Sequence, residues 1–452
     1  MALGELPELI IEPLYLSMNR IILVGNGFDL AHNLKTKYSD FLDYYWSLII
    51  DGINQDARKP YSGYGVQTDR GFEYGELNAI TFKEVYQCCL NENVNLKFSN
   101  KFLEIISSKN DIQKWVDVEE EYYNQLLKTI KNSEEYSIYN LNSDFLEIKN
   151  AFITYLKKEV PEIDGKELQK HTKIKIKPDI ASHIFSNFSI KDFTESGLYI
   201  LVDELTEAFM NYRSSVHKND EFNDYHIFKS LKDHLNSIGN VNLNDKNEVF
   251  TSVMDLLDYK NRTEDFFEIS PKNIYILNFN YTNTAQIYSN HHTEKFIKSD
   301  LNYVWPEINH IHGYLEDLKN NPVIFGFGDE LDDNYSQIEK LKNNEYLENI
   351  KSIRYSDTDN YKKLLQFINS DNYQIFIFGH SCGVSDRTML NTLFEHENCV
   401  SIKPYYHLKE NGMDNYSDIV RNISRNFNNK ASMRDKVVNK TYCQPLVSNP
   451  KN

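Results

Sequence analysis

Short, uninterrupted hydrophobic runs occur near the start of the chain and recur through its last two-fifths. A run of about four apolar residues without polar alternation is typical of a strand that is buried on both faces of a parallel sheet. Amphipathic helical patterns separate the later runs, which is the order of elements expected for a parallel α/β sheet. Strands are predicted over residues 21–24, 274–277, 308–312, 323–327, 374–378 and 400–405.

Elsewhere, hydrophobic residues recur at intervals of three and four, the spacing that places them on one face of a helix. The first helix is expected from Ser39, after the first strand and its glycine-rich turn, and Ser143 is expected to cap another. The stripes are Phe41, Leu42, Tyr45, Trp46 and Ile49; Trp115, Val118, Tyr122, Leu126 and Ile130; Phe145, Ile148, Phe152 and Tyr155; Tyr361, Leu364, Leu365 and Ile368; and Met389, Leu390, Leu393 and Phe394.

Together these patterns predict a Rossmann-like α/β domain with a parallel sheet, interrupted by a large, mainly α-helical insertion. Residues 18–60 and 266–452 are expected to form the α/β domain, and residues 61–265 the insertion. Residues 1–17 lack the basic and continuous apolar segments of a signal peptide. We interpret them as a short appendage before Met18, which is itself a candidate start.

Composition narrows the classes of function. The net charge of −17 argues against an extended basic surface for nucleic acid or anionic lipid, although it leaves room for a local dinucleotide pocket. No segment approaches the roughly 18–20 apolar residues of a transmembrane helix. The five cysteines form no Cys-x-x-Cys pair, so we expect reduced thiols, a cytoplasmic protein and no zinc site.

The first candidate site follows the first strand, at Gly25, Asn26, Gly27, Phe28 and Asp29. Glycines allow a sharp turn and a close approach of main-chain amides to a pyrophosphate. The third glycine of the dinucleotide-binding fingerprint is missing, so a plain tight turn explains the pattern equally well. An aspartate repels phosphate, and Asp29 is better suited to a ribose hydroxyl or to capping the turn.

Three asparagines, Asn278, Asn280 and Asn283, follow the strand 274–277, where ligands bind in open α/β sheets. Asparagine is common in turns, and for any one of them a structural role is the simpler interpretation. A carboxamide both donates and accepts hydrogen bonds without titrating, so it could also orient a water molecule or a ribose hydroxyl.

Two histidines lie in the predicted strand 308–312, where alternation places His310 and His312 on the same face. Without other information, both are more often structural residues than metal ligands, and no carboxylate or thiol cluster lies near them in sequence. His312 is followed by Gly313, which opens space beside it, so His312 is the better candidate for an acid or base.

A fourth segment, from Phe378 to Asp386, has the order strand, small-residue loop and helix. Ser385 is expected to cap that helix, whose free amides could receive an anion or a ribose, although a simple connection fits as well. The acidic residues Asp117, Glu119, Glu120 and Glu121 are interpreted as the solvated face of a helix rather than as an acid pair.

In this order, the four segments resemble the AbiH family of bacteriophage abortive-infection proteins. The resemblance covers nearly the whole chain from Met18. It rests on Asn19 to His32 continuing to Phe41, on Phe279 to Thr284, on His310 to Gly313 and on Phe378 to Ser381. It implies a bacterial protein that stops the growth of an infected cell before phage are released.

A more distant resemblance is to sirtuin-like domains, which carry a Gly-Ala-Gly turn, a Thr-Asn-Tyr-Asp segment, a Leu-His-Gly segment and a late Gly-Tyr-Ser segment. The matched positions here are Gly25 and Gly27, Asn280 and Tyr281, His312 and Gly313, and Gly379 and Ser381. In that superfamily the matched asparagine and histidine serve the site that cleaves NAD.

The sequence departs from the sirtuin-like pattern at two positions of this site. Asp29 stands where a small serine or threonine is usual, and Thr282 replaces the aspartate that follows the tyrosine. The zinc-binding cysteines of protein deacetylases are also missing, as they are in the defence NADases of the superfamily.

The resemblance implies hydrolysis of the nicotinamide–ribose bond of NAD, with NAD as substrate and no metal. Asn280 would hold the attacking water or a ribose hydroxyl, and His312 would accept a proton. The amides from Gly25 to Phe28 and the loop from Gly379 to Ser381 would hold the pyrophosphate and adenosine.

Two alternatives remain: a sensor that binds NAD or ADP-ribose without turnover, and a metal-independent RNA-cleaving toxin that uses His310 and His312. By analogy with defence systems, the insertion is expected to carry homo-oligomer contacts or to sense a phage-derived trigger.

Overall fold

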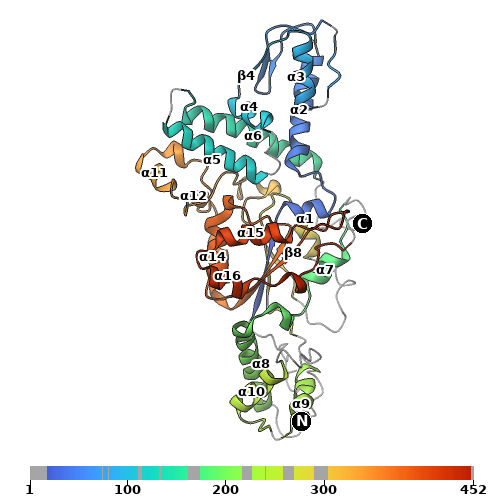
Figure 1. Cartoon of the computed structure of the whole chain (residues 1–452), viewed down its shortest axis with the longest axis vertical. Coiled ribbons are helices and arrows are strands. Elements are labelled where there is room, and N and C mark those ends of the chain that lie inside the picture. The colour runs from blue at the N-terminus through green and yellow to red at the C-terminus, as the bar shows by residue number, and fades with distance from the viewer. Residues whose placement is uncertain are drawn as a thin grey trace, which may run out of the picture.

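A computed structural model describes residues 18–73, 75–79, 81–109, 115–131, 135–160, 174–215, 226–239, 241–257, 269–289 and 304–448. The expected appendage, residues 1–17, lies outside the described residues. The described part of the chain is elongated, with the main sheet near its middle (Figure 1).

The main sheet has five parallel strands in the order β6-β5-β1-β7-β8. This order confirms the predicted Rossmann-like α/β fold. β1 lies at the centre, and the chain leaves it first toward one edge of the sheet and later toward the other. In such sheets the crevice for a ligand opens at the carboxyl ends of the strands on either side of this reversal. The strands are β1 (Asn19–Val24), β5 (Ile274–Asn278), β6 (Glu307–His310), β7 (Tyr373–Phe378) and β8 (Cys399–Tyr405).

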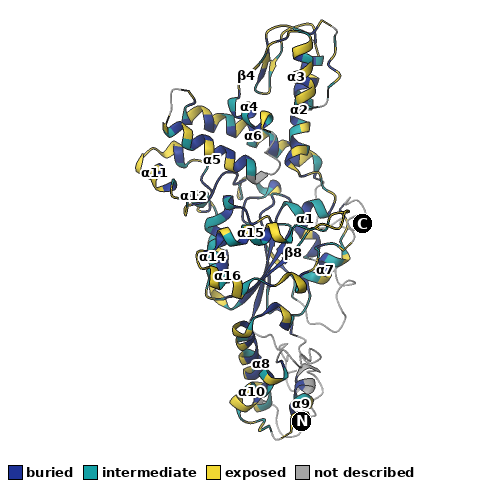
Figure 2. Ribbon diagram, viewed as in Figure 1, coloured by how far each residue is buried: buried dark blue, intermediate teal, exposed yellow. Residues whose placement is uncertain are grey.

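Helices cover both faces of this sheet, because successive strand residues point to opposite sides. Ile21 and Leu23 pack on one face with α13 (Asn360–Ser370), α14 (Arg387–Glu395) and α15 (Tyr416–Asn426). Ile22 and Val24 pack on the other face, with α7 (Pro178–Ile184) and the 3₁₀ helix η2 (Thr284–Tyr288). Buried residues therefore fill β1, β5, β7 and β8, as the dark blue in Figure 2 shows, whereas the edge strand β6 is partly exposed.

The chain contains the following further elements in its described parts: α1 (Asn26–Ala31), α2 (Tyr38–Asn54), β2 (Ser62–Gly63), β3 (Val66–Thr68), α3 (Phe82–Asn91), β4 (Leu96–Phe98), α4 (Lys101–Ser108), α5 (Trp115–Lys131), α6 (Ile138–Glu159), η1 (Ile190–Asp192), α8 (Glu195–Ser215), α9 (His226–Ile238), α10 (Lys246–Leu256), η4 (Leu315–Asp317), α11 (Tyr335–Lys340), η5 (Asn344–Leu347), α12 (Lys351–Arg354), η6 (Val384–Asp386), α16 (Lys430–Lys436) and η7 (Lys440–Tyr442).

The segment expected as a single helical insertion is divided between two separate hydrophobic clusters. The first, which we call the upper unit, contains α2 to α6 and the small antiparallel sheet β2-β3-β4, and it lies beyond the carboxyl ends of the main strands (Figure 1). The second contains α8, α9 and α10 and packs with Met18 at the amino end of β1. α7 lies between them in the chain and packs on the sheet.

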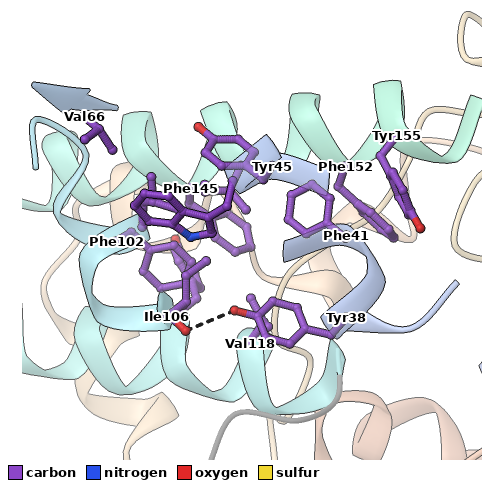
Figure 3. Packing of buried hydrophobic residues seen from close by; sticks show 14 of the residues in the cluster. Tyr38, Phe41, Tyr45, Val66, Phe102, Ile106, Val118, Phe145, Phe152 and Tyr155 are labelled. Carbon is purple, nitrogen blue, oxygen red and sulfur yellow. Dashed lines mark hydrogen bonds between the residues drawn. The ribbon is translucent and has the colours of Figure 1, made fainter. Parts of the chain in front are cut away.

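Aromatic side chains form much of the interior of the upper unit. Phe41, Phe145, Phe152 and Tyr155 lie together there, and the Tyr38 hydroxyl donates a hydrogen bond to the carbonyl of Ile106 at 3.1 Å (Figure 3). The ring of Phe145 also stacks on Phe325, which comes from the α/β part of the chain, with centroids 5.0 Å apart. The upper unit therefore shares its core with the segment that follows β6.

Residues 323–327 do not form the predicted strand. Val323, Phe325 and Phe327 point into the upper unit, whereas Ile324 points into the core on the sheet. The side chains alternate between the two cores, as they would in a strand with a core on each side. The segment lies between these cores, however, and is part of neither the main sheet nor the sheet β2-β3-β4. The hydrophobic pattern was therefore correct about burial and wrong about strand pairing.

Two predicted helix caps were also wrong. α6 begins earlier than expected, and the hydroxyl of Ser137 rather than Ser143 accepts the capping hydrogen bond. The buried stripe of α6 extends forward to Ile138, which moves the start of the helix toward the amino terminus. Ser385 lies within η6, and the residue that precedes α14 is Asp386.

The described helices include none that is both long enough and apolar enough to cross a membrane. The five cysteines are free, and all but Cys88 are buried.

A buried polar cluster connects the amino-terminal half of the sheet to η1. The Nζ atom of Lys403 lies 2.8 Å from Oδ1 of Asp192, and Nε2 of Gln374 donates to Oδ2 of Asp192 at 3.2 Å. The nearby guanidinium of Arg20 donates to the carbonyl of Ser186 at 2.6 Å and lies over the ring of Phe376. Asp192 is the carboxylate that interacts with both of these buried cations.

We predict that Asp192→Ala lowers the free energy of unfolding by about 3–5 kcal/mol, because it leaves a buried ammonium without its counter-charge. Denaturant-induced unfolding measures this loss. Asp56→Ala is the control, since Asp56 pairs with Lys59 in an exposed position, where water screens the charges and loss of the pair should change stability little. Equal losses in the two variants would contradict the assignment.

Candidate functional site

A cavity of about 870 Å³ opens at the carboxyl ends of the central strands. Its wall is formed by the segments that follow β1, β5, β6 and β7, together with side chains from α5 and α6 of the upper unit. This volume lies near the upper end of the range of roughly 300–1,000 Å³ that small-molecule and cofactor sites occupy. The position matches the ligand crevice of open α/β sheets.

Nine of the eleven residues expected at the dinucleotide site line this cavity, although they are far apart in the chain. Phe28 and Gly313 do not line it. Phe28 packs in the core against Phe378 and Tyr288. Gly313 has a φ of +101°, and a Cβ atom there would lie 2.4 Å from the carbonyl of Pro322, so its role is in the backbone. The lining residues are Gly25, Asn26, Gly27, Asp29, Asn280, Tyr281, His312, Gly379 and Ser381.

The glycines after β1 allow close packing of two loops. A Cβ atom on Gly27 would lie 2.8 Å from Cα of Gly379, and one on Gly25 would lie 2.5 Å from Cα of His380. The amide of Gly27 donates to the carbonyl of Gly379 at 2.9 Å, and the amides of Gly25 and Phe28 also bond to main-chain carbonyls. These three amides, which the sequence suggested as pyrophosphate donors, are thus used within the protein.

Asn280 is held on the cavity wall by its neighbours. Its Nδ2 donates to the carbonyl of Gly25 at 3.0 Å, and its main-chain amide donates to Oδ1 of Asn278 at 3.0 Å. Asn278 in turn donates to the carbonyl of Thr282 at 2.9 Å. Asn278 therefore closes the turn, and the carboxamide of Asn280 keeps its Oδ1 as an acceptor beside the cavity.

Asp29 and Thr282, the two departures from the sirtuin-like pattern, contact one another. The hydroxyl of Thr282 donates to Oδ2 of Asp29 at 2.8 Å. Oδ1 of Asp29 is buried and has no hydrogen-bond partner among the described residues. Burial raises the pKa of Asp29, the nearby polar groups of Thr282, Thr284 and Asn280 oppose this rise, and the resulting pKa is about 6. A ligand hydroxyl at this wall of the cavity would supply the missing donor.

His312 is buried and is held by two polar groups. Its Nε2 lies 3.3 Å from Oδ1 of Asp386 and 3.3 Å from the hydroxyl of Tyr355. Burial, with a contribution from Lys351, lowers the pKa of His312 to about 4. The imidazole is therefore neutral at pH 7. Since the ionised Asp386 accepts the proton of Nε2, the lone pair lies on Nδ1.

Asp386 belongs to a buried charged cluster at the inner end of the cavity. The Nζ atom of Lys351 lies 2.9 Å from both Oδ1 of Asp386 and Oε1 of Glu119. Nε2 of His380 lies 3.5 Å from the other Asp386 oxygen. Lys351 and His312 hold the pKa of Asp386 well below its usual value, in spite of burial.

Sequence reasoning missed most of this cluster. Glu119 was expected on a solvated helix face, but it is buried in α5 and lines the cavity. A signal for this was present, because Glu119 comes three residues before Tyr122 in the hydrophobic stripe and therefore shares its face. Lys351 and the pairing of Asp386 gave no sequence signal, since their partners come from distant segments.

The two histidines expected on one face of a strand have separate environments. β6 ends at His310, so strand alternation does not continue to His312. The ring of His310 stacks on Tyr314, with centroids 4.2 Å apart, and its Nδ1 lies 3.2 Å from Nδ2 of Asn278. His310 is absent from the cavity wall. Within the described ranges, no group of three or more His, Cys, Asp or Glu side chains is arranged to hold a metal ion.

The charged side chains of the cavity differ between its rim and its inner end. Lys35 and Lys37 line the cavity and are exposed, so they place positive charge at its rim, where the carboxylate of Asp40 accepts from the amide of Lys37. Glu119 and Asp386 line it and are buried. The rim therefore suits an anionic part of a ligand, and the inner end suits an uncharged or cationic part.

Comparison with known proteins identifies the family of the chain. A family model described as bacteriophage abortive infection AbiH matches residues 21–407, which include every segment of the cavity wall named above. No curated protein and no solved structure matches the chain. The extent of the family match shows that the chain belongs to the AbiH family of bacteriophage abortive-infection proteins.

Proposed function

We propose that this AbiH protein hydrolyses NAD to nicotinamide and ADP-ribose, and that the cavity at the carboxyl ends of the strands is the site of this reaction. The observation that carries the proposal is the meeting of Asn280 and the buried His312–Asp386 pair on the wall of one dinucleotide-sized cavity. Loss of NAD from an infected cell would stop its growth, which agrees with the role of the family.

The reaction depends more on the positioning of NAD and water than on a strong nucleophile. The nicotinamide of NAD is a cationic leaving group, so the bond from its ring nitrogen to C1′ of the ribose breaks with both electrons going to nitrogen. Nicotinamide leaves neutral, and the ribose becomes oxocarbenium-like. A water oxygen then bonds to C1′ and loses a proton. Fixed dipoles and charges next to the ribose stabilise such a transition state.

Each residue has a role that follows from its bonding. Oδ1 of Asn280 accepts a hydrogen bond from the attacking water, since its Nδ2 is bound to Gly25. His312 accepts the proton at Nδ1, and Asp386 stabilises the imidazolium that forms. Oδ1 of Asp29, which has no hydrogen-bond partner in the described part of the chain, accepts from a ribose hydroxyl. Lys35 and Lys37 at the rim face the pyrophosphate, because the glycine-turn amides are used within the protein.

The contact between Asp29 and Thr282 supports the sirtuin-like interpretation of the site. In the sirtuin-like pattern the small hydroxyl residue follows the glycine turn and the aspartate follows Asn-Tyr. Here Asp29 follows the turn and Thr282 follows Asn280-Tyr281, and the two side chains are hydrogen-bonded. The chain thus carries the same two residue types with their positions exchanged.

The wild-type protein is expected to release free nicotinamide when it is incubated with NAD. Binding of NAD without release would favour the sensor, and decay of RNA with NAD intact would favour the nuclease.

We predict that His312→Ala lowers the rate of nicotinamide release by roughly 10²–10⁴-fold, the usual effect of removing a positioned base. Asn280→Ala is expected to lower it by a similar factor. His310→Ala is the matched control, because His310 lies two residues from His312 but outside the cavity wall, and it should keep near-wild-type turnover. Full turnover in a folded His312→Ala protein would contradict the assignment.

The exchanged pair generates a separate prediction. Asp29→Thr removes the carboxylate, and Thr282→Asp brings a second carboxylate beside the first, so each single variant is expected to lose turnover. The double variant restores one hydroxyl and one carboxylate in contact. We expect turnover to recover in it, with a coupling free energy of about 0.5–3 kcal/mol in a double-mutant cycle of kcat/KM. Additive losses would show that the two side chains act independently.

A further inference from the structure

Glu119 makes the upper unit part of the cavity wall. It lies on α5, its side chain is only 7% exposed, and it lines the cavity together with Asn280 and His312. Its carboxylate accepts from Nζ of Lys351 at 2.9 Å and from the amide of Gly326 at 3.4 Å. The inner end of the cavity is therefore built jointly by the sheet and by a helix of the insertion.

The charges at this inner end do not balance. One ammonium, that of Lys351, serves the two carboxylates of Glu119 and Asp386. His312 does not supply a second positive charge, since its lowered pKa keeps it neutral at pH 7. The ring of His380 contacts the other oxygen of Asp386, on the side away from Lys351, rather than Glu119. When Glu119 is ionised, the cluster holds excess negative charge away from water, which is costly in a medium of low dielectric constant.

The pKa of Glu119 reflects this imbalance. Burial and the charge of Asp386 raise it, Lys351 opposes both, and the resulting pKa is about 7. The other titratable groups that interact with Glu119 are Tyr281 and Tyr355, which are neutral because burial raises their pKa values well above 10. A cation that enters the cavity would favour the ionised carboxylate and so lower the pKa of Glu119.

We propose that the inner end of the cavity is a cation subsite, in which Glu119 selects the positively charged pyridinium ring of an oxidised dinucleotide over the uncharged dihydropyridine ring of the reduced form. This inference rests on the proposed function for the identity of the ligand. It adds the charge state that the site recognises and assigns that selection to a residue of the insertion.

The binding of two probes to the wild-type protein tests this proposal without any turnover. The first is the carbocyclic analogue of NAD, which keeps the pyridinium charge but resists cleavage because a methylene replaces the ribose ring oxygen. The second is NADH. A ligand that lowers the pKa of Glu119 binds more tightly to the protein with ionised Glu119 than to the protein with protonated Glu119. By linkage, the ratio of these two affinities is about ten for each unit by which the pKa falls. We expect calorimetry at about pH 8 to show roughly tenfold tighter binding of the analogue than of NADH.

The pH dependence has a defined sign. Only the ionised Glu119 attracts the cation, so the affinity for the analogue should rise as the pH increases from about 6 to about 8. The affinity for NADH should change little. At about pH 7, binding of the analogue should release a fraction of a proton, which calorimetry in buffers of different ionisation enthalpy measures.

Two isosteric variants on the same helix complete the experiment. Glu119→Gln keeps an acceptor for Lys351 and removes the charge, and Glu120→Gln makes the same change at an exposed neighbour. We expect Glu119→Gln to abolish the preference for the analogue and the proton release, and Glu120→Gln to keep both. If Glu119→Gln does not fold, the comparison of the two probes on the wild-type protein still tests whether the cation subsite exists.

The outcomes separate this inference from the proposed function. Equal binding of both probes to the wild-type protein at about pH 8 would overturn the cation subsite and leave the dinucleotide site intact. Binding of neither probe would overturn the proposed function itself. A preference that survives Glu119→Gln would assign the selection to another residue.

Discussion

The ammonium group of Lys351 bonds two carboxylates that come from different parts of the fold. Asp386 follows β7 and is held by the sheet, whereas Glu119 lies on a helix of the upper unit. All three groups are buried, and loss of Lys351 would leave the two carboxylates in the interior without this cation. This constraint fixes the upper unit above the carboxyl ends of the strands, and Asp386 in turn orients His312.

The position of the sheet and the location of the cavity were predictable from the sequence because they depend on local patterns. Uninterrupted apolar runs such as residues 21–24 indicated buried parallel strands, and parallel strands bring the segments after β1, β5 and β7 to one edge. The same reasoning failed at residues 323–327, since burial between two cores gives the same hydrophobic pattern as burial within a sheet. It also failed at Glu119, because the partner that makes its burial tolerable is distant in the chain.

Membership of the AbiH family assigns the chain to abortive infection, but it does not specify a reaction. The case for NAD rests on the contents of the cavity: a carboxamide and a neutral imidazole on the wall, cations at the rim and excess negative charge at the inner end. A nuclease site based on paired histidines is less consistent with these observations, since His310 stacks on Tyr314 outside the cavity. The insertion, expected to serve oligomer contacts or sensing, also contributes directly to the site through α5.

The most direct test of this account is a crystal structure of the protein with the carbocyclic analogue of NAD. The account predicts one dinucleotide in the cavity, with its pyridinium ring near Glu119, the anomeric carbon between Asn280 and His312, and its pyrophosphate toward Lys35 and Lys37. A dinucleotide bound elsewhere on the molecule, or one that reaches the cavity with its adenine at the inner end, would contradict it.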